Sequence, residues 1–131
     1  MKLPTVEFLN SVEHYFSVSY PMQYKLFCSQ NHTFTPTKGQ FITDIETLKT
    51  INRKIGEDQW GDFELAIAGK RHPKDGNKFW GELLPFYFHE SLIYGFPIDG
   101  KDSGSIHVWS VHTIVHSYPS LSAFMEAEFH V

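Results

Sequence analysis

The chain of 131 residues contains a single cysteine, Cys28. One cysteine cannot form an internal disulfide, so the sequence is not that of a disulfide-stapled domain, and a reducing compartment is favoured. No stretch approaches the roughly 18 consecutive apolar residues that a membrane-spanning helix needs. Near the N-terminus, Pro4, Glu7 and Asn10 interrupt the apolar run that a signal peptide requires. We therefore expect a cytoplasmic protein with no membrane segment.

Basic residues are also scarce, with 11 Lys and Arg against 15 Asp and Glu, a net charge of −4. Domains that bind nucleic acid directly are usually basic, so we expect no direct nucleic-acid partner. The imbalance lies late in the chain, because residues 79–131 carry one basic side chain, Lys101, among several acidic ones. Such an acidic part suits a basic partner, or serves only as a solvated surface.

Aromatic residues, in contrast, are abundant: 12 Phe, six Tyr and three Trp make up 16% of the chain. Each buried ring removes about 150–250 Å² from water. A chain of this length is expected to form one domain, spanning residues 1–131, and these rings can close its core without disulfides or metal.

Apolar residues at helical spacing predict two helices at the N-terminus, over residues 5–16 and 21–30. In the second helix Pro21 suits the first position, and Tyr24, Phe27 and Cys28 are expected on its buried side. The buried side of the first helix is expected to contain Phe8, Leu9, Val12, Tyr15 and Phe16.

A third helix is predicted from Ile45, Leu48, Ile51 and Ile55, which follow one another at helical spacing. Thr43 and Glu46 have the spacing of a capping box at its start, and Gly56 suits a left-handed C-cap at its end. A final helix is predicted to begin at Pro119 or Ser120.

Strand patterns are predicted at residues 41–43, 64–68, 83–88, 92–98, 105–110 and 113–117. The short connections between the last four favour an antiparallel meander. Pro97 indicates an edge or a bulge, and His107 and Trp109 are expected on one face of their strand. The element order predicts an α+β fold: a mostly antiparallel sheet of five or six strands, with two N-terminal helices and one C-terminal helix packed on it. No Gly-rich phosphate loop is present.

Three histidines, His107, His112 and His116, lie within ten residues, and the first and last could face the same side of the sheet. Zinc needs three or four converging ligands, and neither a carboxylate nor a cysteine completes a known spacing here. We expect no metal and no cofactor. An enzyme that uses these histidines with a metal or a small ligand stays open as an alternative function. Cys28 is expected to be a buried thiol rather than a nucleophile.

Two further groups have both a chemical and a structural interpretation. The carboxylate pairs Glu57–Asp58 and Asp99/Asp102 could do acid–base work, but they lie in turn-like segments where such residues shape the backbone. The loop Gly69–Lys78 is basic and could contact phosphate or an acidic partner, but a solvated loop explains it as well.

Several segments, in order, resemble the SUKH superfamily, which includes the fungal Smi–Knr cell-wall regulators and many bacterial immunity proteins. The run SYPMQYKLF at 19–27 is similar to the family's Pro-x-x-Tyr/Phe-x-x-Phe signature, with Pro21, Tyr24 and Phe27 as the matches. The strands LLPFYF (83–88), IYGFPIDG (93–100) and IHVWS (106–110) resemble the family's late strands. The segment YPSLSAFMEAEF (118–129) resembles its closing helix.

This resemblance implies a non-enzymatic protein-binding domain. Bacterial members bind and neutralise a cognate toxin, often a nuclease, and fungal members act as interaction hubs, so a general scaffold is a further alternative. A cognate protein toxin is therefore the expected partner. Contact residues are expected in the turn-like segments, where binding residues tend to lie. They are Asp58, Trp60, Asp62, Asp99 and Asp102.

Overall fold

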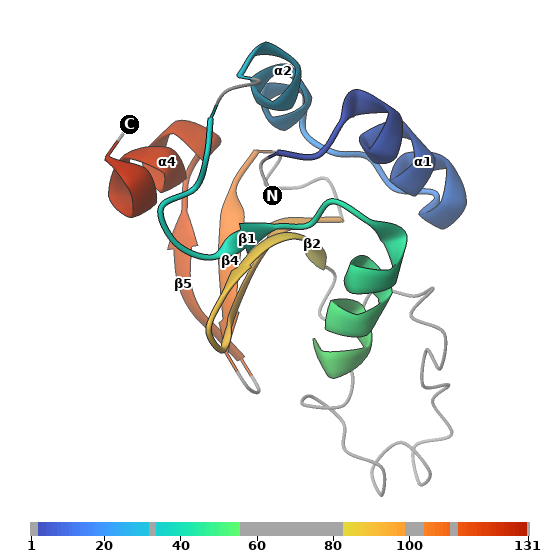
Figure 1. The fold of residues 1–131 in the computed structure, drawn as a ribbon. Coiled ribbons are helices and arrows are strands. Elements are labelled where there is room, and N and C mark those ends of the chain that lie inside the picture. Colours follow the sequence, from blue (N-terminus) through green and yellow to red (C-terminus); the bar gives the residue numbers. More distant parts are fainter. Residues whose placement is uncertain (1–2, 32–33, 56–82, 99–103, 111–112, 131) are drawn as a thin grey trace, which may run out of the picture.

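The computed structural model describes residues 3–31, 34–55, 83–98, 104–110 and 113–130 (Figure 1). The named elements are α1 (Val6–Phe16), α2 (Met22–Gln30), β1 (Gln40–Phe41), β2 (Leu83–His89), β3 (Leu92–Pro97), β4 (Ile106–Ser110), β5 (Thr113–Tyr118) and α4 (Leu121–Phe129). Residues 45–55 form a further helix, drawn in green in Figure 1. The strand predicted at 64–68 and the C-cap predicted at Gly56 lie outside the described residues. Among the described helices, none has the length and hydropathy to cross a bilayer.

The five strands form one sheet in the order β1-β2-β3-β4-β5, and every neighbouring pair is antiparallel. From β2 to β5 the order follows the chain, as short connections dictate. With the helices on either side of it in sequence, this sheet confirms the predicted α+β class. Pro97 pairs with Leu83 of β2, but the ladder between β3 and β4 ends at Gly95. At Pro97, β3 is therefore paired on one side only, which agrees with the edge predicted there.

Side-chain hydrogen bonds cap the N-termini of α1 and α4. The Thr5 hydroxyl accepts a hydrogen bond from the Phe8 N–H at 3.1 Å, and the Ser120 hydroxyl accepts one from the Ala123 N–H at 3.1 Å. Pro21 has an extended backbone (ψ 144°) and is the N-cap of α2, so this helix begins at Met22, one residue later than predicted.

The capping box predicted at Thr43 and Glu46 is wrong by one residue. Asp44 caps the helix instead: its Oδ1 accepts a hydrogen bond from the Thr47 N–H at 2.8 Å, and its Oδ2 accepts one from the Thr47 hydroxyl at 2.9 Å. Aspartate and threonine are both good N-caps, so the sequence offered two adjacent starts. Asp44 is the N-cap because its carboxylate accepts hydrogen bonds from the Thr47 backbone and from the Thr47 hydroxyl together.

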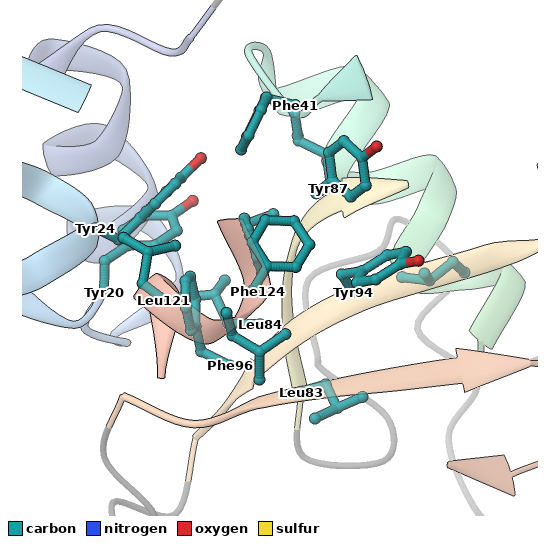
Figure 2. Close-up of a cluster of buried hydrophobic side chains, with 14 of the residues drawn as sticks. Tyr20, Tyr24, Phe41, Leu83, Leu84, Tyr87, Tyr94, Phe96, Leu121 and Phe124 are labelled. Atoms are coloured by element: carbon teal, nitrogen blue, oxygen red, sulfur yellow. The ribbon is translucent and has the colours of Figure 1, made fainter. Parts of the chain in front are cut away.

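Aromatic rings make most of the contacts between the sheet and the helices. Figure 2 shows Phe124 of α4 lying between strand residues, with ring centroids 5.4 Å from both Tyr87 and Tyr94. Phe86 and Phe96 stack at 4.2 Å across β2 and β3. Offset and edge-to-face pairs of this kind add to the free energy gained from burial.

The first helix buries a narrower side than predicted. Leu9 and Val12 are fully buried, and Phe8 and Phe16 pack partly against the core, but Tyr15 is 54% exposed. Tyr15 contacts the Phe16 ring and the Lys49 ammonium, which lies 4.9 Å from its ring centroid. The prediction that Tyr15 is buried is therefore wrong.

Candidate functional site

The predicted contact residues cannot be placed in the fold. All of them lie in 56–82 or 99–103, outside the described residues, as do the pair Glu57–Asp58 and the basic loop Gly69–Lys78. They remain predictions: Asp58, Trp60, Asp62, Asp99 and Asp102.

The histidine cluster does not converge as the metal alternative requires. His107 pairs with Ser117 in the β4–β5 ladder, and the next position pairs Val108 with His116. Adjacent strand residues point to opposite faces, so His107 and His116 lie on opposite faces, and the expectation that they share a side is wrong. His107 Nδ1 lies 2.6 Å from the Ser117 hydroxyl, and the His116 ring packs edge-on to Tyr118 at 4.6 Å. His112 lies outside the described residues.

Cys28 is a buried thiol, as its position on α2 predicted. It is 5% exposed, and burial raises its pKa to about 12, an effect that the nearby Tyr24 hydroxyl offsets only in part. Since the thiolate is the nucleophilic form, this thiol is almost entirely unreactive near neutral pH.

The residues that carry the SUKH resemblance mainly build the core. Tyr24 is fully buried, with its ring centroid 5.1 Å from that of Phe86 and 5.3 Å from that of Phe96. Phe27 packs partly against the same core and contacts the Phe34 ring at 5.5 Å. These side chains position α2 on the sheet, and its opposite side is left to solvent.

A groove of about 420 Å³ lies between α2 and the beginning of α4. In Figure 1, α2 lies between α1 and α4. The α2 wall presents amides and apolar side chains, and the α4 wall presents Pro119, the two serine hydroxyls of Ser120 and Ser122, and Leu121. None of the described lining residues is acidic, basic or a nucleophilic thiol. The remaining described residues of the lining are Gln23, Leu26, Phe27, Gln30, Asn31 and Gly104.

Two large apolar side chains of α2 are exposed at this groove and beside it. Leu26, which lines the groove, is 48% exposed, and Met22, one helical turn earlier, is 63% exposed. Residues four apart lie on the same face of a helix, so Met22 and Leu26 form one apolar strip. Methionine and leucine side chains next to hydrogen-bonding amides are typical of surfaces that bind other proteins.

Sequence reasoning missed this strip, although a signal was present. Helix α2 has apolar residues on both sides, because Tyr24 and Cys28 fill the buried side while Met22 and Leu26 remain opposite. A short surface helix with apolar residues on two opposite sides either is buried on both or presents a spare apolar face.

A second cluster surrounds the Glu128 carboxylate of α4, where β5, β3 and the segment before β1 meet. Tyr118 donates a hydrogen bond to Glu128 Oε2 at 2.6 Å, and Lys38 Nζ lies 3.0 Å from Oε1. Burial by itself raises the pKa of Glu128, but the hydrogen bonds from Tyr118 and Lys38 outweigh it and hold the pKa below its usual value. Burial raises the pKa of Tyr94 to about 12, and Glu128 beside it adds to that effect. The ionised Glu128 carboxylate therefore holds α4 against β5 and against the segment before β1, which is a structural role.

A comparison of the chain with protein-family models, curated proteins and solved structures finds no match. The resemblance to the SUKH superfamily therefore rests on the sequence motifs alone.

Proposed function

We propose that the chain is a non-enzymatic protein-binding domain that binds its partner at the groove between α2 and α4. The observation that carries this proposal is the apolar strip of Met22 and Leu26 beside a groove walled with amides and hydroxyls. Exposed apolar side chains next to groups that satisfy a partner's hydrogen bonds combine the apolar core and the polar rim of a protein–protein interface.

The chemistry of the groove favours binding over catalysis. Proton transfer and nucleophilic attack need a titratable or nucleophilic group at the reacting atom. The described side chains that line the groove are amides, hydroxyls, Pro119 and the apolar residues Leu26, Phe27 and Leu121. A serine hydroxyl becomes an effective nucleophile only beside a general base, and the described lining contains none, so these groups are suited to hold and orient a ligand.

The resemblance to bacterial immunity proteins suggests the class of partner. On that basis the partner is a cognate protein toxin, and binding blocks the toxin. The acidic C-terminal part favours a toxin with a basic surface, because opposite charges speed association and select the partner. The predicted contacts Asp99 and Asp102 belong to this acidic part.

A capture experiment tests the proposal with the full chain as bait and toxin domains encoded by neighbouring genes as candidates. We expect one candidate to form a stoichiometric complex and to lose its toxic activity. If every candidate fails to bind, or if a bound candidate keeps its full activity, the proposal is wrong.

A further inference from the structure

The strand β5 is the last strand of the described sheet, and it is exposed on both faces. Its residues from Thr113 to Ser117 are all exposed, including Ile114 at 42% and Val115 at 54%. The strand pairs with β4 on one side, and within the described residues no strand pairs with its other side. Figure 1 shows β5 beside α4 at one end of the sheet.

An edge strand presents a row of unpaired backbone N–H and C=O groups, and proteins commonly protect such edges with Lys, Pro or a very short strand. The opposite edge is protected in this way, because β1 contains only Gln40 and Phe41. The six residues of β5, TIVHSY, contain neither proline nor Asp, Glu, Lys or Arg. The two edges of the sheet therefore differ: β1 is protected by its short length, whereas β5 has neither a short length nor a charged residue or proline to protect it.

The apolar row of the sheet ends abruptly at β5. Across one face the register aligns Phe88 with Ile93, Ile93 with Trp109 and Trp109 with Ile114. Ile93 and Trp109 are buried, but Ile114, the last member, has a cross-strand neighbour on one side only among the residues that the structure describes. Side chains in a sheet gain stability from neighbours on both sides, so a further strand would complete this row.

We propose that β5 pairs with β5 of a second copy, antiparallel across a two-fold axis, to join the two sheets into one. Unpaired backbone groups specify the occupant as a strand, and the chain itself supplies a strand whose outer edge has no partner among the described residues. A two-fold axis makes such an edge complementary to itself.

The absence of fixed charge on β5 makes the strand compatible with a second copy of itself. The chain carries a net charge of −4, so two copies repel each other wherever fixed charges meet. The segment TIVHSY has no acidic or basic side chain apart from His116, so it can face its own copy without that repulsion. A strand of six residues buries less area than the roughly 1,200 Å² of a stable interface, so the dimer is expected to dissociate on dilution.

The experiment is sedimentation velocity of the full chain over a concentration series that extends to about 1 mM. We expect the average mass to rise from 15.2 kDa at low concentration toward twice that value. The edge variant Ile114→Lys/Val115→Lys puts like charges on the pairing strand and is expected to weaken the dimer at least tenfold. The matched control Met22→Lys/Leu26→Lys adds the same charge at residues of similar exposure and is expected to dimerise like the wild type.

Hydrogen exchange of the wild-type chain gives a readout that does not depend on a variant folding. Pairing at β5 predicts that the backbone amides of Thr113–Tyr118 gain protection as the concentration rises. A monomer at all concentrations overturns the proposal, as does a dimer that survives in the edge variant or leaves these amides unprotected. Protection that requires a foreign protein also overturns it, because the occupant is then a partner's strand. None of these outcomes bears on the groove between α2 and α4.

Discussion

Tyr118 and Glu128 share the shortest side-chain hydrogen bond between β5 and α4, with the Tyr118 hydroxyl 2.6 Å from Glu128 Oε2. The same carboxylate lies 3.0 Å from Lys38 Nζ, which precedes β1. One ionised group thus connects the C-terminal helix, the last strand and the segment that leads into the first strand. The ends of α4 and β5 are expected to depend on it.

Replacing Tyr118 with Phe removes the hydroxyl and keeps the ring that packs on Phe124. We expect a loss of about 1.5–3 kcal/mol in the free energy of unfolding, the usual range for a hydrogen bond to a charged group. The matched control is Tyr15→Phe, which removes a hydroxyl from a ring that is 54% exposed and keeps the ring itself. This control is expected to leave stability unchanged or to increase it. Urea denaturation of both variants measures the difference, and equal losses would show that the Tyr118 bond contributes nothing specific.

The pH dependence of stability is expected to report the same carboxylate. The folded-state pKa of Glu128 is below its unfolded value, so its contribution is fully present above the unfolded pKa, near 4.3, and is lost as the pH falls through the folded pKa. We therefore expect wild type to exceed Glu128→Gln in stability by a margin that is largest near neutral pH and shrinks below about pH 4. Denaturation curves at several pH values measure this margin. A margin that stays constant down to pH 2 would contradict the assignment.

The helix start at Asp44 can be tested against the start that the sequence suggested. Asp44→Ala removes the acceptor for the Thr47 N–H, and we expect a loss of about 0.5–2 kcal/mol in the free energy of unfolding. Thr43→Ala, one residue earlier, is expected to cost clearly less. If the two costs were reversed, Thr43 would be the cap and the capping box would stand.

The Cys28 thiol is expected to resist modification in the folded chain. Its pKa of about 12 leaves roughly a thousandfold less thiolate near neutral pH than an ordinary cysteine has, and burial restricts access further. A thiol-reactive dye should label the native chain very slowly and the chain in guanidinium at the ordinary rate. Rapid labelling under native conditions would mean that α2 opens or that Cys28 is activated.

Periodicity and turn spacing predicted most of the fold because they report local backbone preferences directly. The meander from β2 to β5 is an example, since its short links leave little choice of neighbour. The errors arise where the outcome depends on contacts that are distant in sequence or on a competition between neighbours. Tyr15 fits the apolar stripe of α1 yet lies at the surface. The N-cap is Asp44 rather than Thr43, the adjacent residue, because aspartate is the stronger N-cap.

The candidate site was less predictable, for a physical reason. The sequence predicted contacts mostly at acidic residues in turn-like segments, whereas the groove is lined by neutral side chains. Whether a neutral side chain can contact a partner depends on its exposure, which the sequence does not show. Leu26 and Phe27 are neighbours in sequence, and only the packing of α2 decides that Leu26 is left half exposed. His107 and His116 were separated by the register of β4 and β5, which the sequence does not specify to the residue.

The measurement that tests the central claim most directly is a calorimetric titration of a captured toxin domain into three forms of the full chain. The groove variant Met22→Ala/Leu26→Ala keeps helix-forming residues on α2 and is expected to bind about tenfold to a hundredfold more weakly than wild type. The third form, Ile114→Ala/Val115→Ala, removes two apolar side chains of similar exposure and is expected to bind like wild type. Equal affinity for the wild-type and groove forms would contradict the account.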